Sequence, residues 1–550
     1  MIFNSVEFLI FLAVTYLLYR ILPFRGQNLL LLVASYVFYG WWDERFLFLI
    51  VLSTVIDFCC GLMIDKGQLS RHERWFPSGY LLLAAFCFVT VQWNAIKFTI
   101  QPFALSVQWS QLLPTALSGW LVVLGMFGVV ALANFLYPRL ASFDVHKRRT
   151  LFLFISIFSN LGILGFFKYF NFFIDSAEAT IQTLGMQAEF WHLDIVLPVG
   201  ISFYTFQTMS YTIDIYRRQM QATNRFLDFA LFVSFFPQLV AGPIERASKL
   251  LPCLLQPRQI SFDQSTRGMF LILFGFFKKV AVADSLAISV NAIYETQGVV
   301  SWLDVVLATF LFAGQIYGDF SGYSDIARGV SKLFGVELMV NFNLPYFSKN
   351  PSEFWRRWHI SLSTWLRDYL YIPLGGNRHG ERRTYKNLMT TMVLGGLWHG
   401  AAWNFVLWGF YHGILLCVHR VFTTKFKRKS KVTKNQGFLG SFVAILFFFM
   451  VTCYGWLLFR ANSLTQVISF TQILIFDFGN LALNMPRPTF SGLLGLPLLM
   501  SYELIEYYAG SQYFYRRSPA MMRGLLYAAL TILIVMGTSN EPAQFIYFQF

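Results

Sequence analysis

Two of the eight histidines lie in segments that could carry out acid–base chemistry. His399 stands in the run Gly395-Gly-Leu-Trp-His-Gly-Ala-Ala-Trp403, at the turn between two apolar stretches. Neutral imidazole near pH 7 can take a proton from an attacking hydroxyl, so histidine is the usual general base. The neighbouring glycines would let backbone or a ligand approach His399 closely. The alternative is a packed, hydrogen-bonded histidine without a chemical role.

The second histidine, His359, lies in a segment rich in tryptophan and arginine, residues 354–372. At helical spacing, Trp355, Trp358, Leu362 and Trp365 make one aromatic stripe, which predicts an interfacial helix on the cytoplasmic surface. Such a helix could serve only as an anchor. Arginines stand beside the stripe and could hold the phosphates of a donor or lipid headgroups.

Other reactive arrangements fit the sequence poorly. His412 and His419 are seven residues apart, but no carboxylate or thiolate stands near them, so we expect no metal. Ser202, Ser321 and Ser361 lack the G-x-S-x-G context of a hydrolase nucleophile. The six cysteines contain no C-x-x-C pair and indicate neither a disulfide framework nor a zinc site.

Polar residues gather shortly before the segments that hold the two histidines. Asp319, Ser321 and Asp325 lie in Asp319-Phe-Ser-Gly-Tyr-Ser-Asp325, and Asn341 follows. These side chains could line a cytoplasmic mouth for a polar donor. Helix capping would explain some of them equally well.

The elements that must position these residues are membrane helices. Of 550 residues, 56% are hydrophobic and 13% are charged, against about 25% charged residues in soluble domains. The formal charge of +15 comes from short basic clusters between apolar runs, which disfavours nucleic-acid binding. The composition predicts an all-α polytopic membrane protein.

Apolar runs long enough to cross the bilayer recur along the chain. In the first half we expect them near 5–22, 28–42, 46–64, 79–98, 118–138, 150–174 and 195–215. Basic loops (65–78, 139–149 and 216–226) alternate with an uncharged loop (99–117) and an acidic one (175–194). By the positive-inside rule, the basic loops are cytoplasmic and the N-terminus lies outside.

The second half is less regular. A short run, 227–241, and the pair 388–403 and 404–420 begin and end beside basic loops, so we expect re-entrant segments. Segments 268–290 and 301–318 are expected to cross, the first with Lys278 and Lys279 facing a protein interior or a water-filled cavity. Three further crossings, near 438–459, 488–506 and 524–538, place the C-terminus outside; residues 460–487 remain ambiguous. We find no repeat or linker and expect a single membrane domain over 1–550.

Five segments together resemble the membrane-bound O-acyltransferase (MBOAT) family, in its bacterial alginate O-acetyltransferase-like branch. They are Pro198-Val-Gly-Ile-Ser-Phe-Tyr204, Phe236-Pro-Gln-Leu-Val-Ala-Gly-Pro243, the 319–325 run, the 354–372 run and Leu394-Gly-Gly-Leu-Trp-His-Gly400. The resemblance implies a ring of tilted helices with re-entrant segments around a central tunnel. Residues 319–420 would form the catalytic region, and about 75–150 would be a two-helix insertion.

The resemblance also assigns roles. It implies that His399 is the catalytic base and that His359 assists or shapes the donor tunnel. Arg356, Arg357, Trp358 and Trp398 become candidates for the donor site, together with Asp319, Ser321, Asp325 and Asn341. The expected reaction moves an acetyl group from a cytoplasmic thioester, acetyl-CoA, across the bacterial inner membrane.

The acceptor would be an extracytoplasmic polysaccharide, O-acetylated with the help of an SGNH-type partner enzyme outside. Alginate, cellulose, peptidoglycan and other glycans are all open as the polymer. No bound cofactor or metal is expected, and membrane lipid surrounds the chain. A transporter or flippase is the rival interpretation, because broken helices and buried charges also describe carriers; a scaffold subunit of a polysaccharide-export complex is a third.

The extracytoplasmic tail, 539–550, carries Phe545-x-Tyr547-x-x-Phe550. This spacing resembles the C-terminal F-x-Y-x-x-F motif of the small protein that works with the D-alanyl-transferring member of the family. The resemblance implies that Tyr547 carries the acyl group. The alternative is an aromatic belt at the outer interface.

Overall fold

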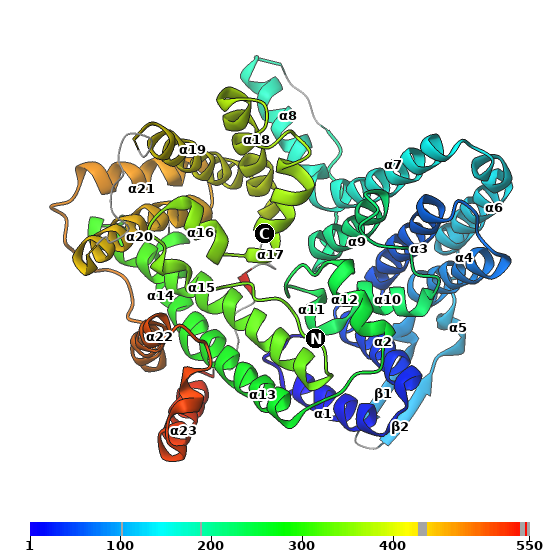
Figure 1. Cartoon of the computed structure of the whole chain (residues 1–550), viewed down its shortest axis with the longest axis horizontal. Coiled ribbons are helices and arrows are strands. Elements are labelled where there is room, and N and C mark those ends of the chain that lie inside the picture. Colours follow the sequence, from blue (N-terminus) through cyan, green and yellow to red (C-terminus); the bar gives the residue numbers. More distant parts are fainter. Residues whose placement is uncertain (101–102, 187–189, 297, 427–436, 539–544, 547–550) are drawn as a thin grey trace. The chain divides into compact units, whose positions relative to one another are not determined.

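The computed structural model describes residues 1–100, 103–186, 190–296, 298–426, 437–538 and 545–546. The described part of the chain is mostly helical, as predicted, and its residues group into two compact units. The first unit holds 1–170, 193–240 and 245–259; the second holds 171–192, 241–244 and 260–550. Figure 1 shows the helices of each unit along the chain.

The first unit contains helices at the N-terminal apolar runs and two short helices that were not predicted, α5 (Trp109–Leu112) and α12 (Ala247–Leu255). The others are α1 (Val6–Ile21), α2 (Phe24–Gly40), α3 (Arg45–Asp65), α4 (Arg71–Ala85), α6 (Leu121–Ala141), α7 (Val145–Leu164), α9 (Ile201–Tyr216), α10 (Phe226–Ser234) and α11 (Phe236–Leu239). The short run predicted at 227–241 is broken into α10 and α11, in agreement with a segment that does not cross.

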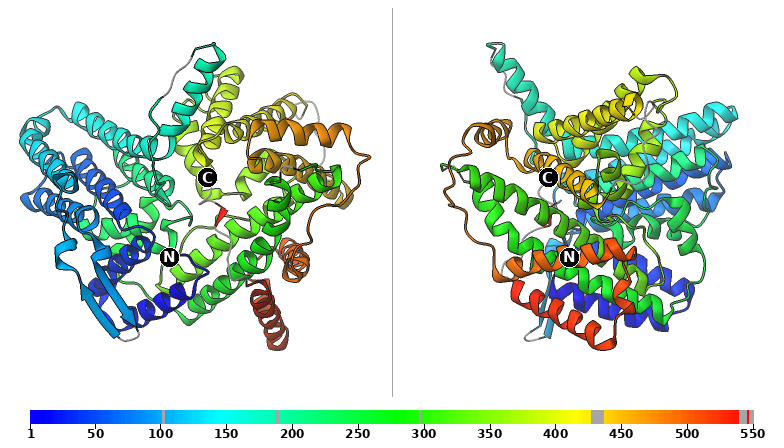
Figure 2. Two further views of the ribbon diagram at one scale, coloured as in Figure 1. Left: turned by 180° about the vertical axis from the view of Figure 1, so that it is seen from behind. Right: turned by 60° about the vertical axis from the view of Figure 1, so that its left-hand side comes forward.

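The predicted crossing at 79–98 is wrong in its extent. Helix α4 starts at Arg71 and ends at Ala85, one π-helical turn continues to Thr90, and an antiparallel hairpin follows. Its strands, β1 (Ile96–Ile100) and β2 (Phe103–Val107), are the paired light-blue arrows in Figure 2. Gln92 and Asn94 end the apolar run, which leaves too few apolar residues for a helix to Phe98. The segment predicted as an insertion, 75–150, thus holds two long helical elements and a hairpin.

Buried polar side chains hold the core of the first unit together where α3, α7 and α9 meet. Asp57 Oδ1 accepts a hydrogen bond from Ser156 Oγ at 2.5 Å, and Asp57 Oδ2 accepts one from Asn160 Nδ2 at 2.8 Å. Ser53 Oγ and Thr208 Oγ1 donate to Asn160 Oδ1. A polar group facing lipid would have no partner, so these residues specify which helix faces pack inward.

The second unit carries the segments that hold the two histidines. Its helices are α8 (Phe170–Thr183, from residue 171), α13 (Phe262–Phe276), α14 (Ser285–Tyr294), α15 (Trp302–Leu333), α16 (Pro351–Arg357), α17 (Ile360–Leu366), α18 (Glu381–His399), α19 (Trp403–Phe426), α20 (Phe438–Arg460), α21 (Leu464–Phe476), α22 (Phe490–Ala509) and α23 (Ala520–Gly537). A π-helical stretch, Phe277–Asp284, joins α13 to α14.

Helices α13 and α15 lie side by side because glycines face each other between them (Figure 1). A Cβ on Gly275 would lie 2.6 Å from the Gly322 carbonyl oxygen, and one on Gly322 would lie 2.8 Å from that of Gly275. Gly268 and Gly329 repeat the contact seven residues away on each helix. Small residues let membrane helices approach closely, and this contact fixes the register of α15.

Two expectations for the second unit are corrected. The crossing predicted at 301–318 continues as α15 to Leu333, so Asp319, Ser321 and Asp325 lie inside a helix rather than in a loop after it. The charges of Asp319 and Asp325 are tolerated there because cations from Phe277–Asp284 and from α15 itself pair with them.

The segment 354–372 is not one interfacial helix. Helix α16 ends at Arg357, His359 adopts a left-handed backbone with φ 43°, and α17 then starts at Ile360. Trp358 and Trp365 are buried at 1% and 6% exposure, so the aromatic stripe packs inside the protein.

Seven helical stretches in the described part of the chain are long and apolar enough to cross a membrane. They are Arg45–Asp65, Leu117–Ala141, Val145–Thr183, Trp302–Leu333, Trp403–Thr424, Phe438–Arg460 and Ala520–Gly537. Many large apolar side chains on them are exposed, as Phe135 and Phe447 are. A surface of this kind suits lipid.

Candidate active site

The two histidines predicted to act together lie together. The ring centroids of His359 and His399 are 6.3 Å apart, and both side chains are buried, at 0% and 4% exposure. Trp398, a second predicted site residue, contacts both, with ring centroids 6.0 Å from His359 and 5.1 Å from His399. The rings converge from the turn between α16 and α17 and from the C-terminal end of α18.

The hairpin of α18 and α19 presents His399 at its turn. Gly396 and Gly409 lie at the crossing, where a Cβ would come within 2.2 Å of the Phe405 carbonyl oxygen and 2.3 Å of the Met392 carbonyl oxygen, respectively. Only glycine permits this backbone-to-backbone approach. The two helices leave the turn side by side in Figure 1, and His399 is the last residue of α18.

Aromatic rings fix the His399 imidazole. The Trp408 and Phe459 rings lie edge-on to it, with centroids 5.0 and 5.4 Å away. Trp408 is 1% exposed, and in the described part of the chain its indole N–H has no acceptor. His399 therefore sits in a mostly apolar chamber where a transferred proton is shielded from water.

Asn341, a predicted site residue, orients His359. Its Oδ1 accepts from the backbone N–H of Ser361 at 3.1 Å and from Ser361 Oγ at 2.9 Å, so this atom is the amide oxygen. The same oxygen lies 3.2 Å from His359 Nδ1, which must then carry the proton. The Nε2 atom of the neutral ring is left as the basic nitrogen.

Burial keeps His359 neutral. It lowers the pKa of this imidazole from 6.5 to about 3. The left-handed backbone at His359 costs of order 1–3 kcal/mol, which buried packing must offset. Strain and a neutral ring at one residue are typical of functional positions.

Trp358 and Asp325, two further predicted site residues, form a ring contact and an ion pair, respectively. Trp358 packs on Trp456 and Phe342, with centroids 4.7 and 4.9 Å away, as part of the core behind His359. Asp325 Oδ2 accepts from Lys278 Nζ at 2.9 Å, and its Oδ1 from Arg328 Nη1 at 3.1 Å. Ser321 is buried.

The predicted interior position of Lys278 and Lys279 is confirmed. Both are about 95% buried, and Lys279 Nζ lies 2.6 Å from Asp319 Oδ1 and 2.9 Å from Asp284 Oδ1. The sequence did not reveal the pairing with Asp319, because only the close packing of α15 on Phe277–Asp284 brings that carboxylate to Lys279.

A cavity of about 530 Å³ lies within the second unit, and neither His359 nor His399 is one of its lining residues. Its basic lining residues are Arg356, Arg367, His419 and Arg420. Trp355 and Ile360 belong to its wall, and the Trp355 ring centroid is 5.7 Å from that of Trp408, which contacts His399. Of these four residues, the sequence predicted only Arg356 as a donor-site residue. No shared spacing marks Arg367, His419 and Arg420 as members of one site.

The neighbouring Arg357 pairs with groups outside the cavity lining. Its Nη2 pairs with Glu353 Oε1 at 2.9 Å, and its Nη1 donates to the Asn343 carbonyl oxygen. It does not line the cavity, so the two predicted donor arginines separate into one that faces the cavity and one that stabilises α16.

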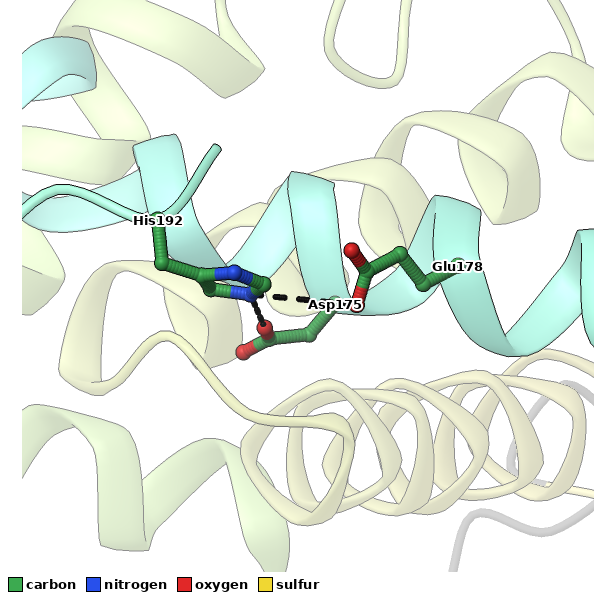
Figure 3. Close-up of side chains that lie close together, drawn as sticks. All are labelled: Asp175, Glu178 and His192. Atoms are coloured by element: carbon green, nitrogen blue, oxygen red, sulfur yellow. Dashed lines mark hydrogen bonds and ion pairs between the residues drawn. The ribbon is translucent and has the colours of Figure 1, made fainter. Parts of the chain in front are cut away.

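The remaining histidine groups suit structural roles. His412 is buried against Trp355 and Trp408, whereas His419 lies in the cavity wall with Nδ1 3.3 Å from Ser352 Oγ, so the two do not share a site. Figure 3 shows a separate surface group, Asp175, Glu178 and His192. His192 Nε2 lies 2.7 Å from Asp175 Oδ1, and that carboxylate raises the pKa of His192. These contacts are those of an exposed ion pair.

The predicted carrier residue, Tyr547, lies outside the described residues. The preceding Phe545 and Ile546 are described, and both are buried in the second unit.

Comparison with known proteins supports the enzyme interpretation. The model of the membrane-bound O-acyltransferase family matches residues 180–459. The "Probable alginate O-acetylase AlgI" of Azotobacter vinelandii is 35% identical over 94% of this chain and 86% of its own length. The protein of the same name from Pseudomonas aeruginosa is 36% identical over 94% of this chain and 82% of its own length.

A "Peptidoglycan O-acetyltransferase" of Helicobacter pylori is also similar, 35% identical over 62% of this chain and 68% of its own length. The predicted branch, the O-acetyltransferase activity and the multi-pass membrane character agree with these matches. The chain belongs to the membrane-bound O-acyltransferase family.

Proposed function

We propose that this membrane O-acetyltransferase moves an acetyl group from acetyl-CoA in the cytoplasm to a polysaccharide outside the bacterial inner membrane. The observation that carries the proposal is the buried pair His359 and His399, which Trp408 and Trp355 connect to a cavity with a basic lining. The relatives named for alginate and peptidoglycan support a glycan hydroxyl as the final acceptor.

In the proposed reaction, His399 accepts the proton of the attacking hydroxyl. The hydroxyl oxygen then bonds to the thioester carbonyl carbon, the carbon–sulfur bond breaks, and the thiolate leaves with the proton that His399 returns. His359 is neutral and fixed by Asn341, so its Nε2 can orient the donor or the acceptor without adding charge.

The cavity suits the phosphates of a nucleotide thioester. Arg356, Arg367 and Arg420 contribute three guanidinium groups, two of which also pair with acidic side chains, Asp368 and Glu381. Guanidinium groups bind phosphates through paired N–H donors. The phosphates of acetyl-CoA would bind in this cavity while its thioester extends to the two histidines.

Arg356→Ala and Arg357→Ala test the donor site as a matched pair. Loss of a charge-assisted bond to phosphate predicts that Arg356→Ala raises KM for acetyl-CoA about 10–100-fold with kcat little changed. Arg357→Ala should leave KM near the wild-type value and lower thermal stability. Equal effects on KM in the two variants would contradict the assignment of the cavity.

Tyr547 would carry the acetyl group between the histidines and the outer partner. A phenyl ester is fairly activated, because phenol, with a pKa of about 10, leaves more readily than an alkyl alcohol. An SGNH-type enzyme outside the membrane would take the group from Tyr547 and place it on the polymer. The F-x-Y-x-x-F spacing and the burial of Phe545 support this role.

Tyr547→Phe removes one oxygen and keeps the aromatic ring. We expect a stable protein that no longer acetylates its polymer, and an acetyl adduct on the Tyr547 peptide of the wild type when the partner is absent. Intact and peptide mass spectrometry measure both. Normal polymer acetylation by the Phe variant would leave the tail with an anchoring role only.

A further inference from the structure

Two buried residues near the end of the chain pack against α15. Phe545 and Ile546 are 4% and 3% exposed, and the Ile546 backbone N–H donates to Asp319 Oδ2 at 2.7 Å. The Phe545 ring lies 4.8 Å from that of Tyr323, one helical turn after Asp319. One face of α15 thus contacts both the backbone N–H of Ile546 and the side chain of Phe545.

The same face of α15 leads directly to the active site. Phe320 follows Asp319 in the chain, and its ring centroid is 6.1 Å from Phe545 and 4.7 Å from His359. The bound segment is therefore separated from His359 by one aromatic ring. Tyr547 is the next residue in the chain after Ile546.

The acceptor of this hydrogen bond is held in place by a buried ion cluster. Lys279 Nζ pairs with Asp319 Oδ1 and Asp284 Oδ1, which leaves Asp319 Oδ2 directed to the Ile546 amide. A charged acceptor makes a stronger bond to a backbone N–H than a neutral one. Lys279 belongs to the π-helical stretch Phe277–Asp284, an irregularity common at functional sites.

The end of α23 lies against the same stretch. A Cβ on Gly537 would come within 2.9 Å of the Val280 carbonyl oxygen and 3.0 Å of Ala281 Cα. Residue 537 and residues 545–546 therefore both contact elements of this cluster. The chain before residue 539 and the chain after residue 544 therefore contact the same part of the second unit.

We propose that Asp319, held by Lys279 and Asp284, is the docking residue for the 545–546 segment and sets the register in which Tyr547 meets the active site. This inference rests on the proposed carrier role of Tyr547 and adds the residues that position it. Asp319 is a positioning residue, not part of a donor mouth. Its carboxylate takes no part in the acyl transfer itself.

Hydrogen exchange of the Ile546 amide tests the dock without any measurement of activity. Asp319→Ala and Asp284→Ala form a matched pair, because each removes one carboxylate from Lys279 and leaves it the other. In the detergent-solubilised full chain, we expect the Ile546 amide to be protected in the wild type and in Asp284→Ala. In Asp319→Ala it should exchange about 10–100-fold faster.

Three results would overturn the dock: an unprotected Ile546 amide in the wild type, unchanged protection in Asp319→Ala, or equal loss in both alanine variants. If Asp319→Ala does not fold, Ile546→Pro removes the donor instead, and Ile546→Val keeps it. Native-state cleavage by chymotrypsin within 545–550 should then be faster in the Pro variant only; equal cleavage in both would contradict the proposal.

The failure of the dock and the failure of the carrier role give different results. If the dock positions Tyr547, Asp319→Ala and Ile546→Pro should lower polymer acetylation about tenfold or more, while thioester hydrolysis by the histidine pair continues. If the Tyr547→Phe variant acetylates the polymer and its Ile546 amide is protected, the dock is supported and the carrier role of Tyr547 is contradicted. Full polymer acetylation by an undocked variant would overturn the positioning role.

Discussion

Asn341 determines which nitrogen of His359 is basic. Its amide oxygen is fixed by Ser361 and faces His359 Nδ1, so the proton stays on that atom. We expect Asn341→Ala to lower kcat about 10–100-fold, because the imidazole loses its orientation. Asn341→Asp keeps an acceptor and should retain more activity, with an altered pH profile from the added charge. Steady-state rates across pH compare the variants, and equal rates for Asn341→Ala and wild type would contradict the role.

The buried imidazole of His359 also makes stability depend on pH. Its pKa is about 3 in the folded protein, lowered by burial from 6.5. Between these values the unfolded chain binds a proton and the folded chain does not, so the free energy of unfolding falls as pH decreases. One such group contributes at most about 1.4 kcal/mol per pH unit.

We therefore expect thermal stability to drop between pH 6.5 and 3, and to drop less in His359→Asn. Asparagine tolerates the left-handed backbone at this position and does not titrate, so it isolates the imidazole. Melting temperatures in detergent at a series of pH values make the comparison. Parallel pH curves for the two proteins would contradict a neutral His359.

At this scale the sequence predicted the reactive residues better than their partners. His359 and His399, which the family motifs mark, lie close together, and Asn341, predicted only to line a donor mouth, contacts His359. Asp319 was assigned to a donor mouth, whereas its partners are Lys279 and the Ile546 amide. Those contacts join residues up to 227 positions apart, a separation at which one sequence carries no pairing information.

The hairpin of α18 and α19 is the element on which the site depends most. Gly396 faces the backbone of α19, and a Cβ there would overlap the Phe405 carbonyl oxygen. Gly396→Ala should separate the helices, displace His399 and lower activity about 100-fold, with a stability loss of about 1–3 kcal/mol.

Gly440→Ala in α20 is the matched control. A Cβ at Gly440 meets nothing within 4 Å, so alanine should preserve activity and stabilise the helix by up to about 1 kcal/mol. Activity and melting temperature of both variants are measured side by side. A fully active Gly396→Ala protein would show that close packing of the hairpin is not required.

Helices were easier to predict than the breaks within them. Apolar runs gave α1, α3, α6, α20 and α22 to within a few residues, because a bilayer demands length and apolarity. The break at Trp358–His359 is invisible in periodicity, since the aromatic stripe fits a continuous helix equally well. The continuation of α15 past Gly318 depends on paired charges supplied by another helix.

At the scale of the whole chain, the alternation of loop charge predicts its orientation in the membrane. The loop with His146 should be cytoplasmic, and the one with Leu184 should lie outside. Both side chains are exposed, so each can be replaced by cysteine after the exposed Cys253 is changed to serine. A membrane-impermeant maleimide should label Leu184→Cys in spheroplasts and His146→Cys only after lysis. The reverse pattern would invert the proposed direction of transfer.

The central claim is that His399 takes the proton in acyl transfer within a site formed with His359. Its most direct test measures acetyl transfer from labelled acetyl-CoA, and acetyl-CoA binding, in purified wild type, His399→Ala, His399→Gln and His359→Ala. We predict that both His399 variants lose about 10²–10⁴-fold in transfer and bind the donor normally, whereas His359→Ala retains a measurable remnant. Transfer by His399→Gln at a rate near that of the wild type would contradict the account.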